Sequence, residues 1–275
     1  MNQVFSFNRW LLLVAKHWNE NRKKYLLSLV AMAGLLLLWF AFMILVERPQ
    51  PFAPTEQGIT YYVGLFLIGC YYGSTLFSDL SGGPKAMHFL SVPASALEKL
   101  LTVLLFGVLL FFLCYTLIFY AVDVPMIKLA NNIAAEYWKE SGQSFTPVDI
   151  VNVFKLGDFK GLDTFTVLLM IYFPVQSAFI LGSVYFSKYS FIKTAISLFL
   201  IFLLNLFFIA QVLNGLLPHG TYMSNLLSYG VMENGQVKAV ELPGWITATI
   251  LTLFKYAFAP IFWVTTWFRL KEKEI

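Results

Sequence analysis

The sequence predicts an all-α polytopic membrane protein with six transmembrane helices, an N-terminal amphipathic interfacial helix, a short cytoplasmic helix and a small helical outer loop. Three observations carry this prediction. Of the 275 residues, 59% are hydrophobic and only 12% are charged, whereas about a quarter of the residues in soluble domains are charged. Apolar runs long enough to cross a bilayer recur along the chain. Lys and Arg gather in alternate connections between those runs.

The first 24 residues are predicted to form a helix that lies in the lipid headgroup layer. Apolar side chains recur at the spacing of one helical face, at Phe7, Trp10, Leu11, Val14 and Trp18. Basic residues occupy another face, where they can meet anionic lipid. The alternative is a helix packed on a soluble partner, but Trp at both ends of the stripe favours the membrane. The residues expected at the interface are Trp10, Lys16, Trp18 and Lys23.

The rest of the chain reads as one transmembrane domain over residues 1–275. Each span is recognised as a run of about twenty predominantly apolar residues. The six predicted spans are about 25–46, 59–78, 98–122, 165–187, 192–213 and 246–268.

The distribution of basic residues predicts the orientation. Twelve Lys and Arg lie in the segments on the side of the two termini, and six lie in the longer connections on the other side. Short loops on the cytoplasmic side carry the excess of Lys and Arg. Both termini are therefore predicted to lie in the cytoplasm.

Two outer connections are long enough to have structure of their own. The loop 123–164 contains two segments with a helical pattern, 126–141 and 148–159, and predicts a small helical cap. The connection 214–245 contains the segment 222–232, which is too short to span and too apolar to lie free in water, so we expect a re-entrant or interfacial segment there.

Several kinds of chemistry are missing from the sequence. There is no GxxxxGK[ST] phosphate-binding loop, no HExxH and no GxSxG. Cys70 and Cys114 lie in separate apolar runs, and the three histidines lie far apart in the predicted topology. The chain is therefore not expected to be an enzyme, and we predict no catalytic residue, metal site or cofactor in it. A net charge of +4 without a basic patch does not indicate nucleic-acid binding.

The loop between the second and third spans, 79–97, is the most informative connection. Gly82, Gly83 and Pro84 break the chain at its start, and residues 91–95 break it again. The residues between the breaks can form one or two helical turns. Ser95 and Glu98 match a capping box that begins the third span. A short helix is thus predicted between two breaks at the membrane face.

These residues resemble a family. The segment LSVPASALEK at 90–99, together with the predicted topology, resembles the permease subunits of type-2 ATP-binding-cassette exporters, in a version similar to those of Bacteroidota. The resemblance implies a bacterial inner-membrane protein that pairs with a second permease copy, identical or related. It also implies cytoplasmic ATPase subunits that bind Mg-ATP and receive the short helix as a coupling helix. The coupling residues implied by position are Gly83, Lys85, His88, Leu90, Pro93, Glu98 and Lys99. The loop 123–164 is long for this family and suggests an extracytoplasmic partner.

Polar residues within the spans are candidates for a translocation path. Lys255 lies near the middle of the sixth predicted span, where an unpaired charge is costly. It either contacts substrate or a dimer seam, or it reaches an interface or a polar neighbour and serves packing alone. The other candidates are Gln176, Asn205 and Gln211. Gly69 and Gly73 form a GxxxG pattern, which favours close helix packing within one subunit over a dimer seam.

The predicted function is the transmembrane half of an exporter that moves an amphipathic or lipid-like substrate outward. One alternative is a non-transporting membrane scaffold that recruits a partner through the loop 123–164. Another is a secondary transporter or channel that uses Lys255.

Overall fold

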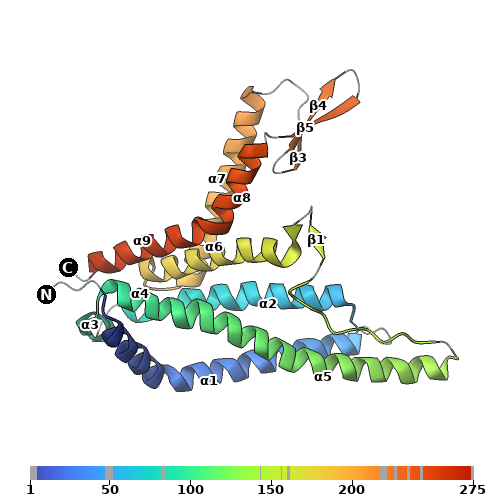
Figure 1. Ribbon diagram of the computed structural model, residues 1–275, viewed down its shortest axis with the longest axis horizontal. Coiled ribbons are helices and arrows are strands. Elements are labelled where there is room, and N and C mark those ends of the chain that lie inside the picture. The colour runs from blue at the N-terminus through green and yellow to red at the C-terminus, as the bar shows by residue number, and fades with distance from the viewer. Residues whose placement is uncertain are drawn as a thin grey trace.

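A computed structural model gives the arrangement of the chain (Figure 1). It describes residues 5–46, 52–81, 84–142, 144–155, 157–159, 162–216, 222–225, 228–233, 236–241 and 244–273. The described residues are mainly helical, and five helices are long and apolar enough to cross a membrane. The chain is therefore a membrane protein, as the sequence predicted. These five candidate spans are Phe7–Val46, Pro54–Leu80, Ala96–Glu140, Thr164–Tyr185 and Ser190–Ile209.

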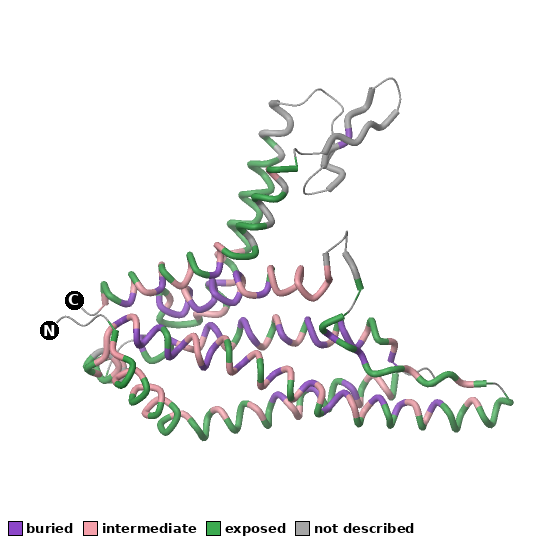
Figure 2. Tube along the Cα trace, in the orientation of Figure 1, coloured by how far each residue is buried: buried purple, intermediate pink, exposed green. Residues whose placement is uncertain are grey.

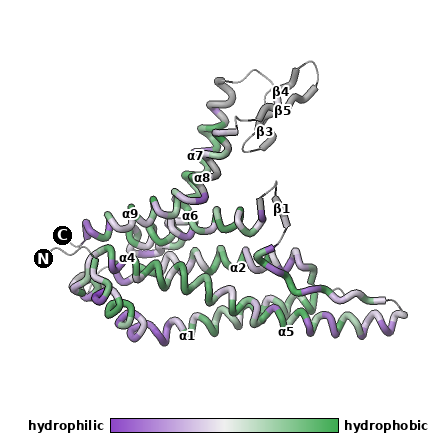
Figure 3. Tube along the Cα trace, viewed as in Figure 1, coloured by the Kyte–Doolittle hydropathy of each residue, from purple (hydrophilic) through white to green (hydrophobic). Residues whose placement is uncertain are grey.

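The long helices form a bundle with both chain termini at one end, here called the terminal end (Figure 1). Figure 3 shows hydrophilic residues at the terminal end and along the half of α5 that lies farthest from this end. Helix α1 runs without a break through the predicted interfacial helix and the first span. The helices of the bundle are α1 (Phe7–Val46), α2 (Pro54–Thr75), α4 (Ala96–Leu104), the π-helical turn η2 (Leu105–Leu110), α5 (Phe111–Glu140), α6 (Thr164–Tyr185) and α9 (Phe258–Lys273).

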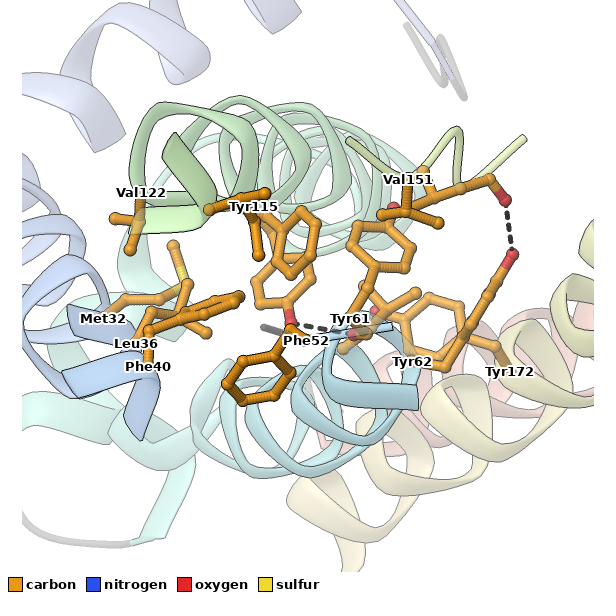
Figure 4. Packing of buried hydrophobic residues seen from close by; sticks show 14 of the residues in the cluster. Met32, Leu36, Phe40, Phe52, Tyr61, Tyr62, Tyr115, Val122, Val151 and Tyr172 are labelled. Atoms are coloured by element: carbon orange, nitrogen blue, oxygen red, sulfur yellow. Dashed lines mark hydrogen bonds between the residues drawn. The ribbon is translucent and has the colours of Figure 1, made fainter. Parts of the chain in front are cut away.

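Tyrosines fill the core where α1, α2, α5 and α6 meet (Figure 4). The side chains of Tyr61, Tyr115 and Tyr172 are fully buried. The Tyr115 hydroxyl donates to the carbonyl oxygen of Tyr61 at 2.8 Å, so this polar group is satisfied inside the core. Glycines on α2 leave room for the rings, because a Cβ at Gly64 would collide with the Tyr115 hydroxyl and a Cβ at Gly69 with that of Tyr172.

The GxxxG pattern lies against α6 of the same chain. A Cβ at Gly69 would meet Tyr172, and a Cβ at Gly73 would lie 3.3 Å from the carbonyl oxygen of Gln176. Both neighbours belong to α6. The expectation that these glycines serve packing within one subunit is therefore confirmed.

The sixth predicted span, 246–268, is divided. It forms two helices, α8 (Gly244–Tyr256) and α9, with a turn at Ala257. Pro260 lies in the first turn of α9 and has no N–H to donate to the carbonyl four residues earlier, so the sequence favours a break there. Neither helix is among the five candidate spans. A single sixth span over these residues was wrong.

The outer loop 123–164 also differs from its prediction. The helical pattern at 126–141 is confirmed as a continuation of α5, which ends at Glu140. The second expected helix, 148–159, is wrong. Residues 144–152 have no regular secondary structure, and the segment ends in a small antiparallel hairpin of β1 (Asp158–Phe159) and β2 (Leu162–Asp163).

Helix α7 (Ser190–Leu216) extends beyond the fifth predicted span, and a small sheet follows it. This antiparallel sheet has the order β3–β4–β5, from β3 (Tyr222–Asn225), β4 (Ser228–Glu233) and β5 (Gln236–Glu241). It occupies the connection 214–245, for which we expected a re-entrant or interfacial segment. The helical class is confirmed, and the two sheets in the connections are additions to it.

Candidate coupling site at the terminal end

A short helix lies between two breaks at the terminal end, as the sequence predicted. Helix α3 (Pro84–Ser91) follows the 3-10 turn η1 (Ser78–Ser81), and bends at 92–94 separate it from α4. The capping box at the start of α4 is also confirmed. Ser95 Oγ accepts from the amide of Glu98 at 3.2 Å, and the Glu98 carboxylate accepts from the amide of Ser95 at 2.9 Å.

Helix α3 has an anchored side and an exposed side. The Phe89 ring packs edge-on against Phe77, with ring centroids 6.2 Å apart. Phe77 is buried in an apolar cluster that is separate from the tyrosine core and that includes residues of α4, α6 and α9. The side chain of Met87, in contrast, is 74% exposed, and His88 is exposed beside it. Helix α3 is thus fixed to the protein through Phe89, while the large apolar side chain of Met87 points away from the protein.

Glu98 is a buried charge at the terminal end whose carboxylate is well supplied with donors. Its side chain is fully buried, and its carboxylate accepts hydrogen bonds from four donor groups, the farthest of them 92 positions away along the chain. The donors are the Ser6 amide (2.8 Å), Arg9 Nε (2.7 Å), Arg9 Nη2 (2.8 Å) and the Ser95 amide (2.9 Å). Because a buried carboxylate is stable only when it is paired and hydrogen-bonded, Glu98 holds the start of α1 against the start of α4.

The other implied coupling residues fall into three groups. Lys99 is 3% exposed, and its Nζ lies 5.4 Å from the centroid of the Phe89 ring, so it covers the anchor of α3. His88 and Pro93 are exposed at the surface. Gly83 lies outside the described residues, as do the side chains of Lys85 and Leu90, whose backbone belongs to α3.

The residues expected at the membrane interface all lie on the first turns of α1. Trp18 is 44% exposed and stacks on Tyr25 and Phe106, with centroids 6.2 and 6.4 Å apart. Lys16 Nζ lies 3.8 Å from a carboxylate oxygen of Glu20, and Lys23 is exposed. Trp10 is partly buried beside the rings of Phe5 and Phe7.

The four path candidates have different surroundings. Gln176 is fully buried in α6, where its Nε2 donates to the carbonyl oxygen of Gly107 at 3.0 Å. Gly107 belongs to the π-helical turn η2, a geometry that disturbs the regular helical hydrogen bonding, so Gln176 has a structural partner. Asn205 and Gln211 are exposed on α7, and Asn205 Nδ2 donates to a carbonyl of its own helix. Lys255 is exposed in the last turn of α8, with its Nζ 5.2 Å from the ring centroid of Tyr256.

Sequence reasoning missed three features. The partners of Glu98 in α1 lie about 90 residues away along the chain, and no local pattern indicates such a contact. The outer segment is fixed by Gln57 and Asn131, which look like ordinary polar residues in the sequence. Asp123 is fully buried, and neither carboxylate oxygen has a hydrogen-bond partner. Its apolar flanks in the sequence are the one signal that could have marked it.

Comparison of the chain with protein-family models, with curated proteins and with solved structures gives no match. Within the described residues, no three His, Cys, Asp or Glu side chains gather into a group that could hold a metal ion. A function is therefore inferred from the contacts described above.

Proposed function

We propose that the chain is the transmembrane subunit of an ATP-driven exporter in the bacterial inner membrane, with both termini in the cytoplasm. The observation that carries the proposal is helix α3. It is anchored to the bundle through Phe89 and presents Met87, 74% exposed, to the surroundings. Methionine is frequent at surfaces that bind other proteins, because its flexible side chain adapts to the partner. In this proposal the partner is a cytoplasmic ATPase subunit that binds Mg-ATP.

The connections of α3 support a role in passing movement to the spans. On one side α3 follows η1 and α2 within a few residues, and on the other side it leads directly into α4. Glu98 joins the start of α4 to the start of α1 through Ser6 and Arg9. A displacement of α3 by the ATPase would thus reach three of the five candidate spans. Alternating access then moves an amphipathic or lipid-like substrate outward.

A second permease copy, identical or related, completes the proposed exporter. Helix α7 supports this part of the proposal, because its residues 199–209 are all exposed and nearly all apolar (Figure 2). Phe199, Leu204, Phe207 and Phe208 are each 60% exposed or more. Lipid and a second copy can both cover such a surface.

The test is isolation of the full chain from its native membrane in mild detergent, followed by mass spectrometry of the proteins that remain bound. We expect a nucleotide-binding ATPase in stoichiometric amount. Met87→Glu should lose it, because a carboxylate replaces the exposed apolar contact, whereas Met87→Leu should keep it. The proposal fails if no ATPase accompanies the wild-type chain, or if Met87→Glu retains it fully.

One observation favours the scaffold alternative. The helical segment Ala96–Glu140 has 45 residues, which corresponds to about 67 Å and exceeds the roughly 30 Å of a hydrocarbon core. The outer half of α5 therefore projects from the membrane with the segment 144–155 beside it (Figure 1). Recovery of an extracytoplasmic protein without any ATPase would support a non-transporting scaffold.

A further inference from the structure

A cavity of about 320 Å³ lies between the end of α2 and the start of α7. Its walls come from the last turn of α2, the residues that follow it, the end of α6 and the turn 186–189 that leads into α7. Figure 1 places this region on the side of the bundle toward the chain termini. The lining residues are Tyr71, Ser74, Thr75, Ser78, Ser183, Phe186, Ser187, Tyr189, Ser190, Phe191 and Ile192.

One side of the cavity is aromatic and preformed. Phe191 contacts Tyr71 edge-on, with centroids 5.9 Å apart, and stacks on Phe179 at 5.2 Å. The hydroxyls of Ser74 and Ser183 donate to carbonyls of their own helices, at 2.6 Å each. The hydroxyl groups of both serines therefore already donate within the protein. This side of the cavity favours an apolar group.

The other side of the cavity favours an anion. Ser190 begins α7, and the first amides of a helix have no acceptor within the helix. Ser190 Oγ is buried and has no hydrogen-bond partner, and the same holds for Thr194 Oγ1 one turn further along. Thr194 itself is only 4% exposed. Thr194 packs against Gly182 of α6 and does not line the cavity, whereas Ser190 does, so the unpartnered hydroxyl of Ser190 at this helix N-terminus points to a polar ligand.

Two lysines flank this N-terminus. Lys188 and Lys193 are exposed, and Lys193 Nζ lies 5.8 Å from the ring centroid of Phe186, which lines the cavity. Neither lysine has an ion pair within the part of the chain that the structure describes. Between them Tyr189, 76% exposed, has a φ of 54°, an unfavourable left-handed conformation for a tyrosine. This turn thus holds an aromatic ring at the cavity mouth at a conformational cost.

We propose that this cavity binds one anionic phospholipid of the inner leaflet. Its phosphate lies at the N-terminus of α7 between Lys188 and Lys193, and the upper part of an acyl chain lies against Tyr71 and Phe191. Basic pockets between helices on the cytoplasmic side are typical sites for anionic headgroups. The inference rests on the orientation proposed above and does not depend on an ATPase.

The test uses native mass spectrometry of the full chain in detergent, titrated with phosphatidylglycerol or with phosphatidylcholine of the same acyl chains. We expect the wild type to retain one phosphatidylglycerol in preference to phosphatidylcholine. The double variant Lys188→Gln/Lys193→Gln should bind phosphatidylglycerol roughly twenty-five-fold more weakly, at about a fivefold contribution from each lysine near a lipid surface. The control variant Lys128→Gln/Lys139→Gln removes two exposed basic residues on α5, away from the cavity, and should bind as the wild type does.

Three results would overturn the proposal. The double variant could bind phosphatidylglycerol as tightly as the wild type does. The wild type could retain phosphatidylcholine equally well, which would make the cavity a site for acyl chains alone. Millimolar inorganic phosphate could displace the lipid completely, which would make it a site for the free anion. All three leave ATPase capture unaffected, so failure here is distinguishable from failure of the exporter proposal.

Discussion

At the scale of single residues, Glu98 illustrates what a sequence pattern leaves undecided. The capping box with Ser95 was predicted correctly, because a box depends on residues three positions apart. The same carboxylate also binds the Ser6 amide and the Arg9 side chain, and only the folded chain brings these together. The residue implied as a docking contact for the ATPase is therefore buried. Its contacts position the start of α1 against the start of α4.

The pair Arg9–Glu98 should contribute measurably to stability. Arg9→Ala removes the guanidinium that pairs with the Glu98 carboxylate, so we expect the free energy of unfolding to fall below that of the wild type. The double variant Arg9→Ala/Glu98→Ala should recover part of this loss, since no charge remains buried. Unfolding in mixed micelles measures both. Equal losses for the exposed pair Lys16–Glu20 after Lys16→Ala would contradict this account, because exposed pairs contribute about 0–1 kcal/mol.

For Asp123 we expect the opposite effect of substitution, a higher free energy of unfolding. Both of its carboxylate oxygens are buried without a partner, so replacing it with an apolar side chain removes a desolvation cost. Asp123→Leu should raise the free energy of unfolding by about 1–3 kcal/mol. Glu136→Leu, an exposed acid on the same helix, should change it by less than about 0.5 kcal/mol. A destabilised Asp123→Leu would show that this carboxylate has a partner or a function in the folded protein.

At the scale of elements, the outer segment 147–154 shows why the helix expected at 148–159 does not form. A helix was expected there, but side chains of α2 and α5 bind its backbone, which has no regular secondary structure at 147–152 and a turn at 153–154. Asn131 accepts from the amide of Val148 and donates to its carbonyl, at 3.0 and 2.9 Å. Gln57 pairs in the same way with the Asp149 carbonyl and the Val151 amide, at 3.2 and 2.8 Å. Helical periodicity cannot reveal such partners, because they lie elsewhere in the chain.

These amide pairs predict a local change on substitution. Asn131→Ala removes both bonds to Val148, and at about 0.5–1.5 kcal/mol for each bond the segment should open roughly tenfold more often. Hydrogen exchange of residues 147–154 measures this opening. Asn132→Ala, at the exposed neighbouring position, is the matched control and should exchange as the wild type does. Unchanged exchange in Asn131→Ala would mean that apolar contacts alone, chiefly those of the buried Val151 and Val153, hold the segment.

At the scale of the whole molecule, composition and apolar runs were sufficient for the class of protein and for five of the six predicted spans. Composition and apolar runs did not reveal that the sixth predicted span is divided into two helices, although Pro260 marks the place where the helix is interrupted. The path candidates illustrate a further limit. Gln176 is bound inside the bundle, whereas Asn205 and Lys255 are exposed on α7 and α8, which run away from it at a steep angle (Figure 1). Polarity within a span marks a residue that needs a partner, and the fold alone decides which partner it has.

Site-specific photocrosslinking from α3 tests the exporter proposal most directly. A photoreactive amino acid at position 87, whose side chain is 74% exposed, would react in intact cells with whatever lies against α3. The same substitution at position 137, an exposed tyrosine near the outer end of α5, is the control. The account predicts a covalent adduct with a cytoplasmic nucleotide-binding ATPase from position 87 and none from position 137. Adducts with lipid or extracytoplasmic protein from position 87, and none with an ATPase, would contradict it.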